Sequence, residues 1–310
     1  MFKLSTTKGI LEKARGLLMR PIQYEVRVPS GDWSSYFGKY ENQKWGMWDS
    51  NSCWALSGIN CIEDQLEFLS KTGQFSAEAM QFFKDEGYID TDGDFSLSER
   101  FIEILSGIKD NGNDQMQFWI LAQEYGLIPR SDLTYTQERS YMFASKEAFN
   151  YDYFNKGQIT QDMYDKGQKF LFYVNIARQW IGKPWTTPDL NILRQALKQA
   201  PLQYGVPVPV NVSNWNNSII PYDGRISANH AIEGYKINDD DTLPIFDQYL
   251  PNLKVLGKGY LLSFVTQGII TPQKQVVANP VPQDVKENSF WTAIMNWWND
   301  IFSSVQVGSS

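Results

Sequence analysis

One cysteine in the sequence stands where a helix is expected to begin. Cys53 follows Asp49-Ser50-Asn51-Ser52, a run of residues that favour the N-cap position, and an apolar stretch with helical spacing starts directly after it. The N-terminus of a helix stabilises negative charge, so a cysteine there can exist as the thiolate, which is the nucleophilic form. A half-buried structural cysteine is the alternative, and the helix start alone does not decide between the two.

A single histidine is the base that such a thiolate would need. His230 is the only histidine of the chain, and it opens the apolar run Ala231-Ile232-Glu233-Gly234-Tyr235, so it is expected at the start of a strand. A lone histidine is more often an ordinary surface or core residue. However, no other side chain acts as an unperturbed base near neutral pH, so any Cys-His mechanism in this protein depends on His230.

The elements that must position these two residues change character along the chain. Apolar spacing predicts helices in the first two-thirds, at 5–18, 52–69, 77–86, 96–108, 115–125, 161–181 and 187–199. Short apolar runs between turn residues predict antiparallel strands later on, at 206–212, 231–237, 244–249 and 259–266. A helical part followed by a strand part predicts an α+β fold of two lobes, with a cleft between them.

The composition argues against several classes of function. The chain has 310 residues, of which 42% are hydrophobic, enough for a substantial core. Its 35 acidic residues exceed its 28 basic ones, so nucleic acid is an unlikely partner. No run of about 18 consecutive apolar residues predicts a transmembrane segment. Two cysteines on one predicted helix cannot bridge each other, and no export signal is evident, so we expect a reducing compartment, by default the cytoplasm.

The segment around the cysteine, Ser52-Cys53-Trp54-Ala55-Leu56-Ser57, resembles the Ser-Cys-Trp-Ala-Phe-Ser segment that carries the nucleophile of papain-like cysteine peptidases. Further blocks similar to that family follow in the same order, at 28–33, 41–43, 97–100, 111–113, 122–128 and 229–235. The resemblance spans about 32–264, with a divergent helical insertion at about 136–184.

This resemblance implies a fold, an activity and a set of site residues. It implies a papain-like peptidase domain over 28–269, with Cys53 as nucleophile, His230 as base and a peptide or protein as substrate, and it implies no cofactor or metal. Gln43 would help to bind the oxyanion. Asp247 stands where the family has an Asn that orients the imidazole, and a carboxylate would also favour the imidazolium; a surface acid is the alternative. The residues expected to contact substrate or wall the site are Trp54, Gly112, Asn113, Asn229 and Tyr249.

Departures from the family leave alternatives open. The loop between Gln43 and Cys53 is longer than the family's, so Asn51 is a second candidate for the oxyanion donor. The usual disulfides are missing, and the segment before Pro29 is shorter than the usual inhibitory propeptide. A catalytically weak or inactive papain-like fold that serves binding or assembly is therefore one alternative function, and a cell-wall amidase is another.

The chain ends and one acidic run carry further signals. Residues 1–27 are expected to form a helix and an extended lead-in, 270–288 a linker, and 289–307 an amphipathic Trp-rich helix that packs on its own domain or on a partner protein, with a membrane surface as the third alternative. The run 90–99 begins like a calcium-binding loop, but Phe95 and Phe101 stand where Gly and a bidentate Glu belong, so we expect an acidic turn before a helix. The Asn and Lys usage would suit a microbial or viral source.

Overall fold

The computed structural model describes residues 25–38, 43–45, 47–108, 112–183, 185–209 and 211–273. The chain divides into two units, Met1–Gln273 and Lys274–Ser310, and all described residues belong to the first. The predicted N-terminal helix, nearly all of the linker and the Trp-rich helix lie outside the described residues, so the expected partner at the Trp-rich helix stays a prediction.

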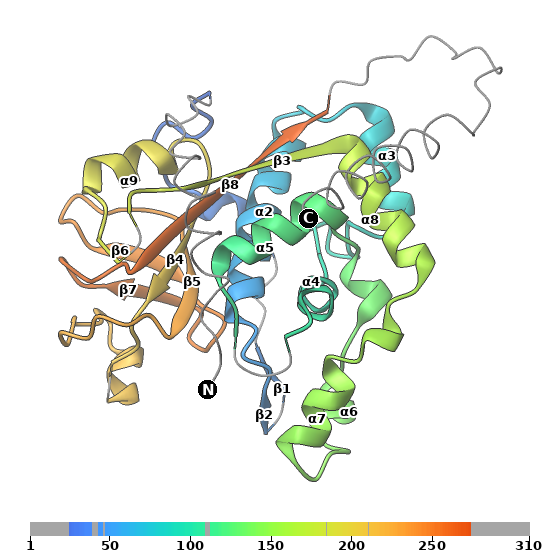
Figure 1. Ribbon diagram of the computed structural model, residues 1–310. Helices are drawn as coiled ribbons and strands as arrows, with labels where there is room; N and C mark the ends of the chain where they lie inside the picture. The colour runs from blue at the N-terminus through green and yellow to red at the C-terminus, as the bar shows by residue number, and fades with distance from the viewer. Residues whose placement is uncertain are drawn as a thin grey trace, which may run out of the picture. The chain divides into compact units, whose positions relative to one another are not determined.

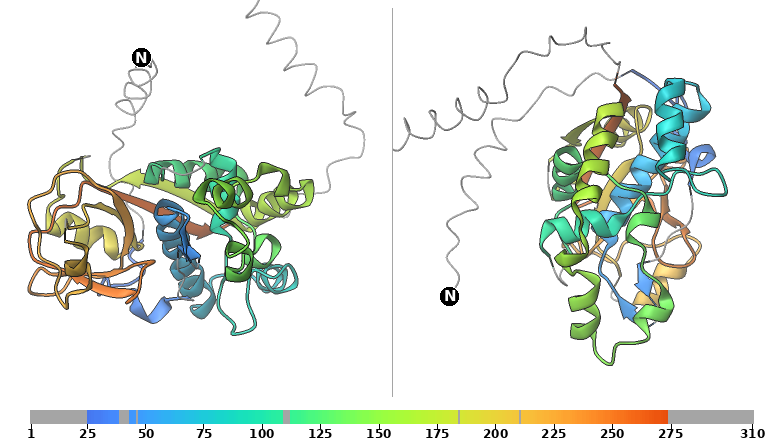
Figure 2. Two further views of the ribbon diagram at one scale, coloured as in Figure 1. Left: turned by 90° about the horizontal axis from the view of Figure 1, so that it is seen from below. Right: turned by 90° about the vertical axis from the view of Figure 1, so that its right-hand side faces the viewer.

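Helix α2 (Cys53–Lys71) runs through the middle of this unit and is buried on every face. Each residue from Trp54 to Leu69 is buried. A helix with only one apolar face would leave the other in water, so α2 must be covered from several sides. Helices cover one side of α2 and the strands of a sheet cover another, as Figure 1 and Figure 2 show.

Polar side chains on α2 remain buried because they bind the main chain of neighbouring segments. Glu63 accepts a hydrogen bond from the Leu97 N–H at 2.7 Å. Gln65 accepts one from the Ile270 N–H at 2.9 Å and donates one to a neighbouring carbonyl on the same strand. Buried polar groups of this kind are stable only when they are paired, so these bonds fix where the neighbouring loop and strand lie against α2.

Helices form the part of the unit on one side of α2. Most of them begin with a side-chain cap, for example Ser76, whose hydroxyl accepts from the Ala79 N–H, and Asp114, whose carboxylate accepts from the Met116 N–H. The helices of this part are α3 (Ala77–Asp85), α4 (Glu99–Ser106), α5 (Gln115–Tyr125), α6 (Gln137–Ser140), α7 (Lys146–Tyr153) and α8 (Gln161–Tyr173), whereas α9 (Leu190–Leu197) lies beside the sheet (Figure 1).

A six-stranded antiparallel sheet forms the other part of the described residues, in the order β3-β8-β4-β5-β6-β7. Strands β3 and β8 are the long pair that crosses Figure 1 from the sheet to the helices. A separate hairpin, β1 (Lys44–Trp45) and β2 (Trp48–Asp49), precedes α2. The strands of the sheet are β3 (Val174–Trp180), β4 (Leu202–Val206), β5 (His230–Gly234), β6 (Leu243–Phe246), β7 (Leu253–Leu256) and β8 (Phe264–Pro272). The predicted α+β class is confirmed.

Several predicted elements are corrected by the sheet. The helix expected at 161–181 ends at Tyr173, and the next residues form β3, because they pair with β8 over the whole strand from Val174 to Trp180. The strand expected at 206–212 is observed as β4, which ends at Val206. The strand expected at 259–266 is observed as β8, which begins at Phe264. Strand β8 also takes up the start of the predicted linker. Strand β7 was not predicted.

The insertion at about 136–184 consists of α6, α7, α8 and β3, and Arg100 on α4 holds its first part. The buried guanidinium donates to the carbonyls of Thr134 at 3.2 Å and Tyr153 at 2.7 Å, and to Gln158 at 3.1 Å. It also lies 4.7 Å from the centre of the Tyr135 ring. One buried cation therefore joins α4 to two points of the insertion and to the segment directly before it.

The acidic run at 90–94 forms a turn in which Asp90 accepts hydrogen bonds from the N–H groups of Asp92, Gly93 and Asp94. Over the described ranges, no group of three or more acidic, histidine or cysteine side chains could hold a metal ion. No helix in the same part of the chain is long and apolar enough to cross a lipid bilayer.

Candidate active site

The fold brings together Cys53 and His230, the two residues whose chemistry the sequence singled out. Cys53 is the first residue of α2 and is half-buried, and His230 is the first residue of β5 and is buried. The Cys53 side chain lies near enough to the imidazole to act on the pKa of His230. Because the two elements pack along each other, the helix N-terminus and the strand end meet at one point.

Asp247 completes a chain of three side chains. It follows directly after β6, is fully buried, and its Oδ1 lies 2.7 Å from Nε2 of His230. Since Nε2 faces the carboxylate, Nδ1 is the ring nitrogen left to face Cys53. The structure therefore places Asp247 in contact with the imidazole, not at the surface.

Two residues that the sequence did not single out hold the other oxygen of Asp247. Trp215, in the 3-10 helix η4 (Val212–Asn216), donates its Nε1–H to Oδ2 at 2.6 Å and packs edge-on against the His230 ring at 5.7 Å. The ammonium of Lys254 on β7 donates to Oδ2 at 2.7 Å. A lone tryptophan in a polar loop was the one sequence signal for Trp215. Nothing in the local sequence pattern indicated Lys254.

The electrostatics of the site favour the charged forms of His230 and Asp247. Burial lowers the pKa of His230, but the charge of Asp247, its hydrogen bond and the contact with Cys53 outweigh that effect and raise the pKa to about 10. Burial by itself would raise the pKa of Asp247, yet the positive charges of His230 and Lys254 hold it below its ordinary value. An imidazolium between a carboxylate and a sulfur atom is the expected state at neutral pH.

Gln43, the expected oxyanion donor, lies close to the site but its amide is already engaged. Its Nε2 donates to Oδ1 of Asp49 at 3.0 Å and to the hydroxyl of Tyr249, and that hydroxyl donates in turn to Oδ2 of Asp49. The Tyr249 ring also contacts His230, with a centroid distance of 5.4 Å. The amide could bind an oxyanion only after leaving one of these oxygens.

The N-terminus of α2, where Cys53 lies, has no side-chain cap. Ser52 occupies the N-cap position, but its side chain makes no capping hydrogen bond. Asn51 has a left-handed backbone with φ of 57°, and its N–H binds Asp49 at 2.8 Å. Gly112 lies alongside, since a methyl group on it would come within 3.8 Å of the Asn51 carbonyl oxygen. The segment expected to pair with substrate is therefore next to the Cys53 loop.

The remaining predicted substrate residues are placed less favourably. Trp54 is 2% exposed and belongs to the core, and its place on the wall of the site stays a prediction. Asn113 uses its Oδ1 to accept from the Asp114 N–H at 2.8 Å. Asn229 is exposed, and its Oδ1 accepts from the Val208 N–H at 2.7 Å, so it stabilises a turn beside the site.

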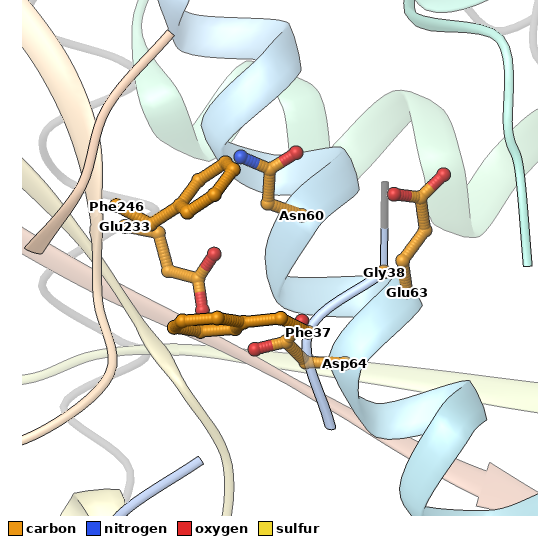
Figure 3. Close-up of a pocket in the computed structure, with 7 residues that line it drawn as sticks. All are labelled: Phe37, Gly38, Asn60, Glu63, Asp64, Glu233 and Phe246. Carbon is orange, nitrogen blue, oxygen red and sulfur yellow. The ribbon is translucent and has the colours of Figure 1, made fainter. Parts of the chain in front are cut away.

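A second contact between α2 and β5 lies further along both elements. Figure 3 shows Asn60, Glu63 and Asp64 of α2 and Glu233 of β5 around a cavity of about 10 Å³, which is room for about one water molecule. Burial raises the pKa of Glu233 to about 7, with the hydrogen bond from Asp64 opposing part of the rise. Burial and the Glu233 charge raise the pKa of Asp64 well above its ordinary value, so this carboxyl favours its protonated form.

Comparisons with known proteins are informative at the level of structure only. No protein-family model matches the chain, and no curated protein matches it. The solved structures that it resembles are cysteine proteases. The proform of Amb a 11, a major ragweed pollen allergen, is 14% identical over 77% of this chain, with a TM-score of 0.47. This chain spans 64% of the length of that proform, which is less than two thirds.

Two further solved structures are matched by this chain over almost their whole length. The Carica candamarcensis cysteine protease CMS1MS2, in complex with E-64, is 14% identical over 78% of this chain and 97% of its own, with a TM-score of 0.47. The bromelain protease from Ananas comosus, also with the E64 inhibitor, is 10% identical over the same shares, with a TM-score of 0.46. These are likenesses in fold, and they assign no role to any residue of this chain.

Proposed function

We propose that this protein is a cysteine-type peptidase that hydrolyses peptide bonds with Cys53, His230 and Asp247. The observation that carries the proposal is the order of three side chains, in which the imidazole of His230 lies near the Cys53 side chain and bonds to the buried carboxylate of Asp247 at 2.7 Å. A thiol at a helix N-terminus, beside an imidazole that a carboxylate holds, has the surroundings that stabilise a thiolate. The motifs around Cys53 and His230 support the same activity.

The reaction has two halves. The Cys53 thiolate attacks the peptide carbonyl carbon, and the C–N bond breaks as the His230 imidazolium gives its proton to the leaving amine, which leaves a thioester. Neutral His230 then takes a proton from a water molecule as that water attacks the thioester. The C–S bond breaks, the carboxylic acid leaves, and the thiolate–imidazolium pair is restored.

The tetrahedral intermediates carry an oxyanion that needs hydrogen-bond donors. The first N–H groups of a helix have no acceptor within it, and Ser52 does not cap them, so the Cys53 N–H is the first donor. Gln43 is the second candidate, provided that its amide turns from Asp49 or Tyr249 towards the substrate. Asn51 remains the alternative, because it lies on the same loop.

The test is a pair of cysteine variants on one helix. Cys53→Ala should abolish hydrolysis of a fluorescent casein, because no nucleophile remains. Cys61→Ala is the matched control, since Cys61 is a buried free thiol of α2 in the core, and it should keep the parent activity. A Cys53→Ala protein that cleaves casein as fast as the parent would end the proposal. Running the assay with cell-wall peptides as well separates a peptidase from an amidase, which would share the same acyl chemistry.

A non-catalytic binding protein is the second candidate, and the engaged amide of Gln43 is the observation that favours it. The reactivity of Cys53 distinguishes the two. At pH 5.5 an ordinary thiol is almost fully protonated and reacts very slowly with iodoacetamide, whereas a thiolate paired with His230 reacts readily. Mass spectrometry then shows whether Cys53 or Cys61 carries the label, and equal, slow labelling of both would favour the binding protein.

The reducing compartment also belongs to this proposal. Both cysteines are free thiols, and Cys61 is fully buried. Oxidation of Cys53 would remove the nucleophile, so a peptidase of this kind needs a reducing environment to stay active. Cytoplasmic action is the compartment that we propose on this basis.

A further inference from the structure

Strand β7 carries a lysine at a buried position, where an apolar residue is expected. Leu253 is 47% exposed and the next residue, Lys254, is 4% exposed, so the alternation of the strand is inverted at these positions. Burial of an ammonium group costs several kcal/mol unless its charge and hydrogen bonds are satisfied. The interior around Lys254 must therefore offer specific partners.

Those partners all belong to the loop that connects β6 with β7. The Lys254 Nζ donates to Oδ2 of Asp247 at 2.7 Å, to the Pro251 carbonyl at 2.6 Å and to the Tyr249 carbonyl. An ammonium has three N–H bonds, and all three are used. The side chains of Lys254 and Asp247 are 1% and 0% exposed, so water does not screen this ion pair.

Asp247 thus contacts two cations, His230 through Oδ1 and Lys254 through Oδ2. An imidazolium loses its charge whenever it gives up its proton, and a buried carboxylate without a cation is strongly destabilised. At neutral pH a lysine ammonium stays charged while an imidazole gives up and regains its proton in a reaction. Lys254 therefore compensates the negative charge of Asp247 whether the imidazole is protonated or neutral.

We propose that Lys254 is a positioning residue of the active site, a permanent counter-charge that keeps Asp247 ionised and in place while His230 releases and regains its proton. The part of this inference that concerns the reaction rests on the proposed function, whereas the effect on the imidazole does not. The other groups that face the imidazole are the Cys53 sulfur from α2, the Trp215 ring and the Tyr249 ring, with Asp49 behind the last, and none of them is a cation.

The single histidine makes the test direct, because every imidazole signal in the NMR spectrum of the reduced protein comes from His230. In Lys254→Met, Asp247 loses its permanent counter-charge and holds the imidazole proton more tightly, so the pH midpoint of the His230 titration should rise by about one unit. Lys258→Met is the matched control: it removes a lysine whose side chain is 71% exposed and paired with Asp241, and the midpoint should not move.

A folded Lys254→Met protein with the parent midpoint overturns the inference. If Lys254→Met does not fold, the double variant Asp247→Asn/Lys254→Met decides. It buries neither charge, so it should fold and resist urea better than Asp247→Asn alone, in which Lys254 is left without its carboxylate. A double variant that is no more stable than Asp247→Asn also overturns the inference.

Peptide hydrolysis adds a separate readout. Lys254→Met should lower kcat about tenfold with little change in KM, because the proton that His230 delivers is held more tightly while peptide binding is untouched. The titration needs no substrate. A shifted midpoint in a protein that cleaves no peptide would therefore leave the role of Lys254 standing and remove the proposed function, and cleavage with an unshifted midpoint would do the reverse.

Discussion

Replacement of Glu233 by Gln tests the buried carboxyl pair that α2 and β5 share below the active site (Figure 3). Glu233 has its pKa raised by burial from the ordinary 4.5 to about 7. The folded protein therefore keeps a proton on this carboxyl that the unfolded chain releases above about pH 4.5. By linkage, the stability that depends on this proton is fully present below pH 4.5, decreases as the pH rises towards 7, and is lost above it.

The size of the effect follows from the distance between the two pKa values. Each pH unit between them changes the free energy of unfolding by about 1.4 kcal/mol, so ionisation of Glu233 costs the folded protein about 3 kcal/mol. Gln has nearly the same shape, carries no charge and can accept the hydrogen bond from Asp64. Glu233→Gln should match the parent at pH 4 and be about 3 kcal/mol more stable at pH 8.

Urea unfolding at pH 4, 6 and 8 measures this difference directly. Glu78→Gln is the control, because Glu78 is an exposed carboxyl on α3 and its removal should leave the pH dependence unchanged. The reasoning is refuted if the stabilities of Glu233→Gln and the parent run parallel from pH 4 to pH 8.

Three further variants test how the site and the insertion are held. Trp215→Phe keeps an aromatic ring but removes the N–H that Asp247 accepts, so thermal unfolding should show a loss of about 2 kcal/mol and casein hydrolysis a clear decrease; an unaltered protein would mean that this bond contributes nothing. Arg100→Lys leaves carbonyls of the insertion without donors and should cost about 3 kcal/mol in urea unfolding, with earlier proteolysis within the insertion. Gly58→Ala places a methyl group 2.2 Å from the Phe118 ring and should cost more than about 2 kcal/mol, although alanine favours helices; a raised melting temperature would contradict this packing.

Elements with strong local signals were predicted closely. The helix expected at 115–125 is observed as Gln115–Tyr125, and that expected at 52–69 as Cys53–Lys71. Both have apolar residues at helical spacing and a recognisable start, which depend on residues a few positions apart. Cys53 and His230 were likewise found from residue type and local context.

Elements decided by distant partners were predicted poorly. Residues 174–180 have a pattern that continues a helix, yet they form β3 because β8, far along the chain, offers a complete row of hydrogen bonds. Strand β7 gave no signal because its apolar alternation is inverted by Lys254.

The sequence by itself determined that this chain has one candidate thiol at a helix start, one candidate imidazole, and a helical part followed by strands. Only the tertiary structure decided that Trp215 and Lys254 hold the carboxylate behind the imidazole, that Gln43 bonds to Asp49 and Tyr249, and that the carboxyls of Asp64 and Glu233 are buried together between α2 and β5. The physical reason is that charge–charge and hydrogen-bond energies depend on distance in space and on burial, and neither can be obtained from the spacing of residues along a chain.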